Sequence, residues 1–209
     1  FGCEEKIKEA IKYIDENIKP KAIMMVTTCV LEVIGEDTEG IRNLLEDEIN
    51  AKLMVVKTEH FKCNNHIVGM EDALTELIVL MEEQEKEKGS INILGHRQHD
   101  IEETELFNIL KEENVKINSI APSNSSIESL ITTPKGELNI VTDFVALPLA
   151  KEMVSKFNIP YVYFDKNLSM ERVKEGYKKI EDSLNINILD KLQQKEKQLI
   201  SLIEEAKKK

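Results

Sequence analysis

The stretch INILGHRQHDIEETELFNILKEENVKINSI, residues 91–120, decides the fold. Its ends, residues 91–94 and 115–120, are apolar runs of strand length, and residues 101–113 between them have the spacing of a helix. A strand, a helix and a second strand of these lengths predict two parallel strands joined by a right-handed crossover. Continuous apolar runs are also typical of parallel strands that are buried on both faces.

The same alternation of strand and helix extends outward in both directions. Further strands are expected at residues 22–26, 53–56, 138–141 and 160–163. Further helices are expected at residues 7–18, 41–49, 69–81, 126–131, 146–157 and 170–184. These elements predict an α/β fold with Rossmann-like parallel sheets flanked by helices, arranged in two units.

A charged stretch at residues 82–88, closed by Gly89, is interpreted as a helix end and a domain boundary. An ordinary solvated last turn of a helix is the alternative. Residues 1–88 would then be the C-terminal part of a first Rossmann-like domain, and residues 89–185 a second one. Residues 186–209 are expected to form a long polar C-terminal helix. This helix lacks sustained heptads, so packing on the chain's own sheet is favoured over a coiled coil.

The composition excludes several classes of protein. The 209 residues include 39 acidic and 28 basic side chains, a net charge of −11, and no basic stripe with interleaved aromatics, so nucleic acid is not an expected partner. The acidity is interpreted as a solvated surface, with a docking face for an electron donor as the alternative. No apolar run approaches the roughly 20 residues of a membrane helix, and no signal peptide is visible. We therefore expect no membrane partner and predict a cytoplasmic location.

Polar residues follow the predicted strands. Ligands of open α/β sheets bind beyond the carboxyl ends of the strands. Those positions here hold TTCVLEVIGED (27–37), TEHFKCNNH (58–66), GHRQHD (95–100), APSNSS (121–126) and TDF (142–144). All four histidines lie in these segments, and His96 is a candidate cofactor contact. Because loops carry polar residues anyway, His96 and His99 could instead be merely solvated.

Cys29, at the end of the first predicted strand, has two interpretations. It is either a small buried hydrophobic residue or a metal ligand. Iron–sulfur clusters generally take four thiolates, so one cysteine cannot hold a cluster. Any cluster at Cys29 would need ligands from another segment or another subunit. Asp37 is interpreted as the N-cap of the following helix.

Several blocks of sequence resemble the nitrogenase component 1 family. They occur in the same order as in that family and cover nearly the whole chain. These blocks are Phe1-Gly2 before EEKIKEAI (4–11), TTCVLEVIGED (27–37), the loop at 58–69, INILG (91–95), TTPKGELNIV (132–141) and NIPYVYFD (158–165). The resemblance implies a nitrogenase-like oxidoreductase, similar to the α chain. It also implies that a sequence opening with Phe1 is a fragment that lacks an N-terminal segment and a third domain.

The resemblance carries over to individual residues. Cys29 aligns with the family cysteine that ligates an iron–sulfur cluster at the subunit interface, although Val30 replaces the usual proline. Asp143 stands where the nitrogenase α chain has the cysteine that anchors the catalytic metal cofactor. A hard carboxylate replaces a soft thiolate there, so no molybdenum–iron cofactor is expected, and Asp143 remains a candidate cofactor contact. His66 lies where family chains face the cofactor pocket. The loop at 59–63 looks closer to nitrogenase-like tetrapyrrole reductases.

The mechanism that the resemblance implies is an electron relay. A separate ATP-dependent iron–sulfur reductase would deliver single electrons to the interfacial cluster, which would pass them to a substrate in an interdomain cleft. The expected partners are that reductase and a second component 1 subunit, identical or different. Residues 1–209 alone are expected to lack an intact cluster and to be inactive. Two alternatives remain: a scaffold for metallocofactor assembly, and a small-ligand-binding α/β domain without a cluster.

Overall fold

The structure is a computed structural model that describes residues 2–58, 64–164 and 169–207. Within these residues it contains two sheets in which every strand pair is parallel, which confirms the predicted α/β fold class. The smaller sheet pairs β1 (Ala22–Val26) with β2 (Lys52–Val56). The larger sheet has the strand order β4-β3-β5-β6. Its strands are β3 (Ser90–His96), β4 (Lys116–Pro122), β5 (Leu138–Val141) and β6 (Tyr161–Tyr163).

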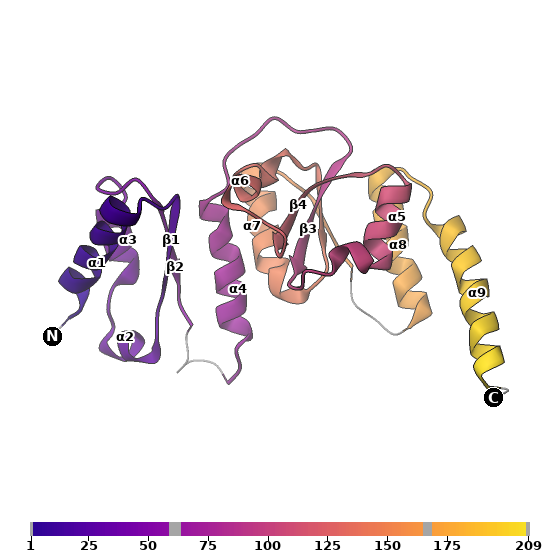
Figure 1. The fold of residues 1–209 in the computed structure, drawn as a ribbon, viewed down its shortest axis with the longest axis horizontal. Helices are drawn as coiled ribbons and strands as arrows, with labels where there is room; N and C mark the ends of the chain where they lie inside the picture. The colour runs from indigo at the N-terminus through magenta and orange to yellow at the C-terminus, as the bar shows by residue number, and fades with distance from the viewer. Residues whose placement is uncertain (1, 59–63, 165–168, 208–209) are drawn as a thin grey trace.

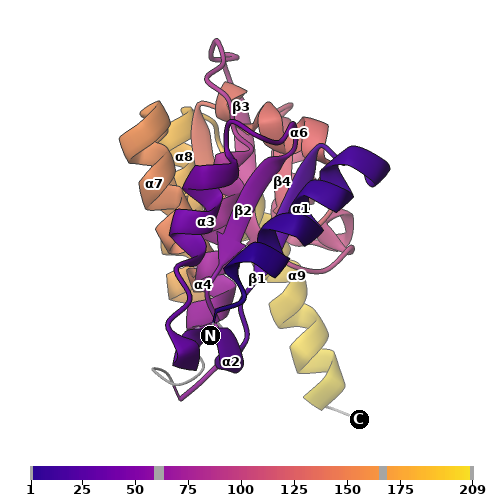
Figure 2. The same ribbon diagram turned by 90° about the vertical axis from the view of Figure 1, so that its left-hand side faces the viewer.

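Helices cover both faces of the smaller sheet. On the outer face, turned toward the viewer in Figure 2, lie α1 (Glu4–Ile18) and α3 (Thr38–Leu45). On the opposite face lies α4 (Ile67–Thr75), which continues as the 3-10 helix η1 (Glu76–Val79) (Figure 1). The apolar stripes of α1 and α3 pack on β2 in a buried cluster formed by Ile11, Ile41, Leu45 and Leu53.

Helices also cover both faces of the larger sheet. One face carries α6 (Ile127–Ile131) and α7 (Leu147–Phe157), and the other carries α5 (Glu105–Glu112) and α8 (Met170–Leu184) (Figure 1). Short 3-10 turns precede or join these helices: η2 (Ile101–Glu103), η3 (Thr133–Lys135) and η4 (Phe144–Ala146). Each face therefore buries its own set of apolar side chains against the sheet.

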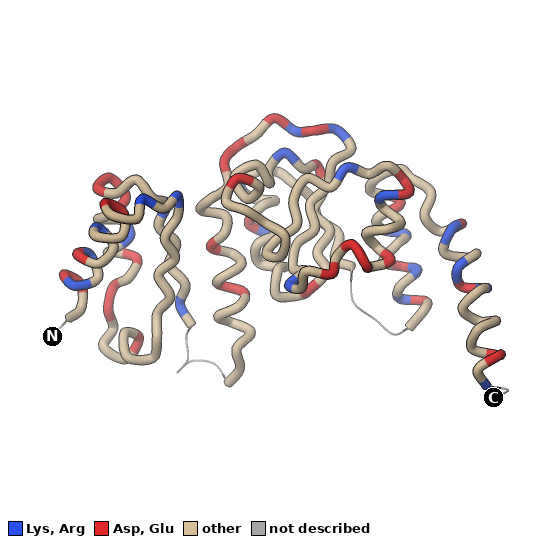
Figure 3. The backbone as a smooth tube through the Cα atoms, in the orientation of Figure 1, with Lys and Arg blue, Asp and Glu red and all other residues tan. Residues whose placement is uncertain are grey.

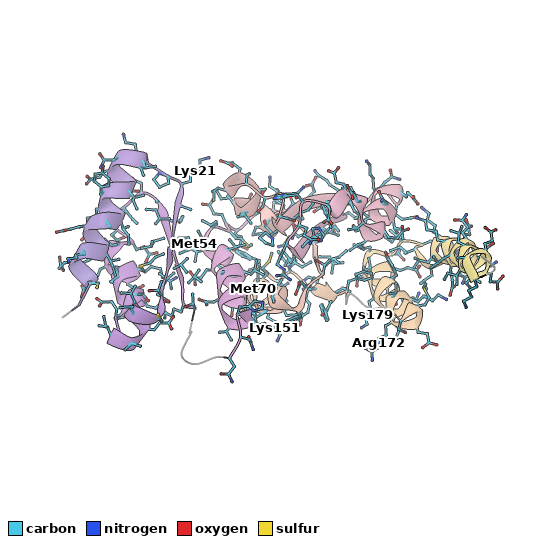
Figure 4. The ribbon with its side chains drawn as sticks, turned by 60° about the horizontal axis from the view of Figure 1, so that its bottom comes forward. Lys21, Met54, Met70, Lys151, Arg172 and Lys179 are labelled. Atoms are coloured by element: carbon cyan, nitrogen blue, oxygen red, sulfur yellow. The ribbon has the colours of Figure 1, made fainter. Side chains whose placement is uncertain are left out.

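One buried cluster connects the two sheets. Met54 of β2 lies between β2 and α4 (Figure 4), and it shares this cluster with Leu74 of α4, Val141 of β5 and Met153 of α7. Because α4 contacts both β2 and α7, this helix packs on the smaller sheet and on the helix layer of the larger sheet. The domain boundary at residue 88 stays a prediction, but the elements on its two sides share apolar contacts.

The prediction of a helix end at residues 82–88 was wrong. The helical path ends with η1, and residues 82–88 follow it as an irregular connection. The Glu82 N–H donates to the Ile131 carbonyl at 3.2 Å and the Glu87 N–H to the Lys135 carbonyl at 2.8 Å. Since this charged stretch offers no apolar stripe, hydrogen bonds to the α6–η3 region replace those of a helix.

Two further segments differ from the prediction. The helix expected at residues 101–113 is interrupted at Thr104, whose side chain caps α5. The segment 27–37, expected to be a loop, contains the short helix α2 (Cys29–Ile34), which ends at Gly35 with a φ of 75°. Glycine favours such a left-handed end because it has no Cβ.

The tail forms α9 (Leu189–Lys207), as predicted. Leu189 and Leu192 pack against the buried cluster that the larger sheet forms with α5 and α8, so the predicted packing on the chain's own sheet holds for the first turns only. The rest of α9 extends away from the sheet (Figure 1), and it exposes Leu199, Ile200, Leu202 and Ile203.

Candidate functional site

The carboxyl ends of the two sheets face the same side of the molecule. In Figure 1 this side is at the bottom, where α2 follows β1 and where α4 begins. Parallel strands bring their carboxyl ends to one edge, and loops at that edge carry the ligands of open α/β folds. The four candidate site residues lie at or near this edge.

Cys29 is the first residue of α2, and its thiol is free and partly exposed. A network of polar side chains fixes the start of this helix. The Thr27 hydroxyl donates to Glu32 Oε1 at 2.9 Å, and the Thr58 hydroxyl donates to the same oxygen at 3.0 Å. Since Thr27 follows β1 and Thr58 follows β2, the ends of both strands hold α2 and thereby position the thiol.

Apolar side chains are exposed beside Cys29. On α2, Val30 and Val33 are 60% and 68% exposed, and Ile34 is also exposed. On the adjacent strand β1, Met24 and Val26 are exposed as well. We call these five residues the α2–β1 apolar surface. The five residues lie on two consecutive elements of the chain, and exposed large apolar side chains are typical of an area that another polypeptide covers.

His66 is exposed at the start of α4, where the Asn65 side chain accepts a hydrogen bond from the Ile67 N–H at 2.9 Å. Because Asn65 supplies this hydrogen bond, the imidazole is not needed to hold the helix end. His60 and Cys63, noted in the same sequence segment, lie outside the described residues. The position of His66 at the carboxyl edge leaves its predicted role as a cofactor contact a proposal.

Asp143 follows β5, and its side chain is mostly buried. One carboxylate oxygen accepts from the Arg97 guanidinium at 3.0 Å, and the other accepts from the Val145 N–H at 3.2 Å. A second nitrogen of Arg97 lies 3.9 Å from the Met70 sulfur of α4. The carboxylate is therefore held by its own chain, and Arg97 connects it to the helix that His66 begins.

His96 is the last residue of β3 and is buried, so the alternative that it is solvated was wrong. Its Nε2 is 2.8 Å from Asp100 Oδ1. His99 is exposed and its Nδ1 is 3.0 Å from Asn124 Oδ1. His96 lines a cavity on the α5–α8 face of the sheet, whereas Asp143 belongs to the turn that leads into α7 on the other face.

The structure brings some of the candidates close to one another and leaves others apart. The backbone of Asp143 lies next to Gly95, the residue before His96, because an added Cβ at Gly95 would lie 2.9 Å from the Asp143 nitrogen. Cys29 lies in α2, which follows a strand of the smaller sheet. In the described part of the chain it makes no hydrogen bond to the other three candidates. Within residues 2–58, 64–164 and 169–207, no three His, Cys, Asp or Glu side chains are grouped as metal ligands.

Sequence reasoning missed two features of this edge. Arg97 lies in the strand-end segment GHRQHD, so its position was a usable signal, but its pairing with Asp143 depends on the register of β3 and β5. Tyr177 gave no signal of this kind, since it lies in a regular amphipathic helix and reaches the cavity only through tertiary packing.

Charge is distributed in mixed fashion over the outer helices, with acidic and basic residues interleaved along α1, α8 and α9 (Figure 3). Many of these charges form ion pairs, such as Lys178 with Asp182 at 2.9 Å. Among the helices of the described residues, none is both long enough and apolar enough to cross a membrane.

Two parallel sheets with their polar carboxyl edges on one side define an α/β protein of the kind that binds ligands beyond the carboxyl ends of its strands. A sequence profile of the family "Nitrogenase component 1 type Oxidoreductase" matches residues 1–209. The chain belongs to this family of oxidoreductases, which confirms the resemblance in its sequence blocks.

The names of individual relatives describe different roles. The nitrogenase iron-molybdenum cofactor biosynthesis protein NifE of Clostridium pasteurianum is 30% identical over 187 residues, which cover 88% of this chain and 41% of the relative. One of the subunits of the light-independent protochlorophyllide reductase of Porphyra purpurea is 26% identical over 177 residues, which cover 77% of this chain and 34% of the relative. The chain thus spans less than half the length of either relative.

Solved structures show the same fold. The structure "Nitrogenase Cp1 at pH 6.5" aligns with a TM-score of 0.76 and 18% identity, over 97% of this chain and 49% of that chain. The structure "Nitrogenase Cp1 at pH 5" aligns with a TM-score of 0.69 and 23% identity, over 87% and 37%. At these identities the likeness establishes the fold alone.

Proposed function

We propose that this chain is part of the cluster-bearing component of a nitrogenase-like oxidoreductase, with Cys29 supplying one thiolate to an iron–sulfur cluster shared with a second subunit. The observation that carries the proposal is the free, partly exposed Cys29 at the start of α2, a helix that also exposes Val30 and Val33. A cysteine enclosed in the core of its own chain could not share a cluster with ligands from another chain.

The residues present fit a shared site better than a complete one. A thiolate is a soft ligand that suits iron, but a cluster needs about four ligands. Cys29 supplies one, and the described residues contain no group of three potential ligands. The remaining ligands would come from outside the described residues. Such a cluster, when bound, would store and release single electrons.

The chain's own residues would position and shield this site. Thr27, Thr58 and Glu32 tie α2 to the ends of β1 and β2, and so hold in place the backbone that carries Cys29. The α2–β1 apolar surface would be covered by the second subunit, identical or different, which would exclude water from the thiolate. His66, His96 and Asp143 remain proposed contacts for a substrate or cofactor, and a molybdenum–iron cofactor anchored at Asp143 is not expected, since a carboxylate held by Arg97 replaces the thiolate.

Membership of the family supports a proposal for the electron donor. We propose an ATP-dependent iron–sulfur reductase as the partner, in a cytoplasmic complex. A second candidate function, metallocofactor assembly, is favoured by the 30% identity to a cofactor biosynthesis protein. The protochlorophyllide reductase relative supports the catalytic role instead. The third alternative, a ligand-binding domain without a cluster, is distinguished by iron content.

The first test compares two cysteines in the full-length protein purified with its partner subunit. Cys29→Ser is expected to remove the visible absorption of the cluster and most of the iron and sulfide. Cys3→Ser is the matched control, because Cys3 is also free and partly exposed, and it is expected to keep full content. Full iron content in the Cys29→Ser protein would refute the ligand role. Residues 1–209 alone are expected to hold no stoichiometric cluster.

The second test separates catalysis from assembly. With the ATP-dependent reductase present, a catalytic component is expected to turn over substrate repeatedly with ATP hydrolysis. An assembly protein would instead release a metallocofactor to an acceptor protein, at one equivalent for each site. Release without repeated turnover would therefore select the assembly role.

A further inference from the structure

A cavity of about 560 Å³ lies at the carboxyl end of the larger sheet. It is bounded by the ends of β3, β5 and β6 and by α5, α8 and α9, with His96, Thr142, Phe164, Tyr177 and Leu192 among its lining residues. Its volume is within the range of small-molecule sites, about 300–1,000 Å³. The cavity lies on the α5–α8 face, opposite the turn into α7 that Asp143 begins.

The cavity walls are mostly apolar. Leu106 of α5 and Val173 of α8 contribute aliphatic side chains, and Leu192 and Leu199 contribute from α9. The Phe164 and Tyr177 rings meet edge to face, with their centroids 4.8 Å apart. An apolar wall of this kind favours a ligand with a largely hydrophobic surface.

One polar atom in this apolar wall has no partner among the described residues. Tyr177 is only 3% exposed, and no hydrogen bond reaches its hydroxyl from the residues that the structure describes. Among the described residues, the only fully enclosed side-chain nitrogen or oxygen without a hydrogen-bond partner is the Ser123 hydroxyl. The Tyr177 hydroxyl is therefore not fully enclosed, and it contacts open space. The open space that Tyr177 lines is the cavity.

The Tyr177 hydroxyl is a permanent donor. Burial, and to a smaller degree the Glu105 carboxylate, raise the pKa of Tyr177 further above its ordinary value of 10.0. The phenol therefore keeps its proton at neutral pH. Because the hydroxyl lines the cavity and has no partner among the described residues, it is free to donate to an acceptor of a ligand bound there.

The charges around the cavity are already matched. Lys195 pairs with Glu105, and Lys174 pairs with Glu196 at 2.6 Å. Asp100 Oδ1 lies within hydrogen-bond distance of His96 Nε2. Because each carboxylate that lines the cavity has a partner within the chain, the rim offers no spare charge to a charged ligand.

We propose that this cavity binds a neutral, largely apolar small molecule whose hydrogen-bond acceptor meets the Tyr177 hydroxyl. This site is separate from the proposed cluster site at Cys29, and it does not depend on the electron-relay function. Loss of the cluster in the Cys29→Ser protein would leave it intact.

The probe for the test is prodan, a neutral naphthalene ketone with environment-sensitive fluorescence, added to the full-length protein. Saturable binding with a blue-shifted emission is expected. Tyr177→Phe removes only the hydroxyl and is expected to weaken prodan binding about 3- to 10-fold, the usual effect of one hydrogen bond. Tyr13→Phe, on exposed α1, is the matched control and is expected to leave binding unchanged.

A second probe and a second variant keep the test decisive. 2-Dimethylaminonaphthalene lacks the carbonyl of prodan, so Tyr177→Phe is expected to leave its affinity unchanged. Leu199→Trp, at an exposed position on the cavity wall, is expected to weaken both probes without unfolding the protein. Absence of saturable binding, as when another segment of the full-length chain fills the cavity, would overturn the proposal. Equal losses for both probes in Tyr177→Phe would overturn the role of the hydroxyl.

Discussion

Asp143 is a structural residue of the strand end as well as a candidate contact. Its two carboxylate oxygens accept from Arg97 at 3.0 Å and from the Val145 N–H at 3.2 Å. The bond to Val145 satisfies one of the free N–H groups at the start of η4, which leads directly into α7. Any ligand that Asp143 bound would therefore compete with bonds that support this turn.

Removing this side chain is expected to cost more stability than removing its partner. Asp143→Ala should lower the free energy of unfolding by about 0.5–2 kcal/mol, the usual effect of losing a cap. Arg97→Ala should cost about 0–1 kcal/mol, because the guanidinium side chain is half exposed. Urea unfolding followed by circular dichroism measures both. A loss in Arg97→Ala as large as in Asp143→Ala would show that the ion pair, not the cap, supports the turn.

Asp15 makes folding stability depend on pH. Its carboxylate accepts from the backbone N–H groups of Asn50 and Ala51, at 3.1 and 2.8 Å, and these bonds hold the pKa of Asp15 below its ordinary value of 3.8. A lowered folded-state pKa adds stability above the ordinary value, and this stability is lost as the pH falls through the folded-state pKa.

Unfolding experiments at several pH values test this dependence. The free-energy difference between the wild type and Asp15→Asn is expected to be constant near neutral pH and to shrink as the pH falls below about 4. Glu16→Gln, at the exposed neighbouring position, is the control and should show no such change. A difference that stays constant down to about pH 2, where an ordinary carboxyl is protonated, would argue against ionisation as the source.

At the scale of elements, α5 shows how a single side chain sets a boundary. Thr104 accepts from the Phe107 N–H at 3.3 Å and donates to the Ile101 carbonyl at 2.6 Å. Its own backbone is extended, which separates η2 from α5. Residues 101–113 contain no glycine or proline to mark this break, so the sequence alone predicted one helix.

Replacing Thr104 tests the cap. Thr104→Ala is expected to reduce stability by about 0.5–2 kcal/mol, since the Phe107 N–H loses its acceptor. Thr104→Ser keeps the hydroxyl and should lose much less. The comparison uses thermal or urea unfolding, and equal losses in the two variants would show that the methyl group of Thr104 matters more than its hydroxyl.

The strong periodic elements were predictable from sequence, and the short ones were not. The strands at 22–26 and 138–141 and the helix at 170–184 have their predicted bounds, because each combines a clear apolar pattern with a defined end. The helix α2 has six residues, too few for a period, and depends on contacts with the ends of β1 and β2. For the same reason the site was predicted as a set of strand ends, while the Arg97–Asp143 pair and the Tyr177 cavity required the folded chain.

At the scale of the whole molecule, α4 makes the two sheets share a core. Met54 reaches this core from β2, and Met24 is its direct partner across the parallel pair. The two side chains nevertheless differ in environment: Met54 is 4% exposed and Met24 is 41% exposed. A large part of the stability of the smaller sheet therefore depends on α4 and the elements beyond it.

This matched pair of methionines gives a direct measurement of the shared core. Met54→Ala is expected to lower the free energy of unfolding by about 2–5 kcal/mol. Met24→Ala is expected to change it by less than about 0.5 kcal/mol. Hydrogen exchange should show that Met54→Ala increases exchange in both sheets. Increased exchange confined to the smaller sheet would mean that the two sheets unfold independently.

Gly95 restricts which sequences can form this edge. Its φ of +94° disfavours side chains, and a Cβ there would lie 2.9 Å from the Asp143 nitrogen and 3.1 Å from the Ala146 Cβ. Gly89 also has a positive φ, of +73°, but an added Cβ would meet nothing within 4 Å. Redesign of this chain therefore has room for asparagine at Gly89, whereas position 95 is closed to every amino acid that carries a side chain. The close approach between the end of β3 and the residues after β5 depends on this glycine.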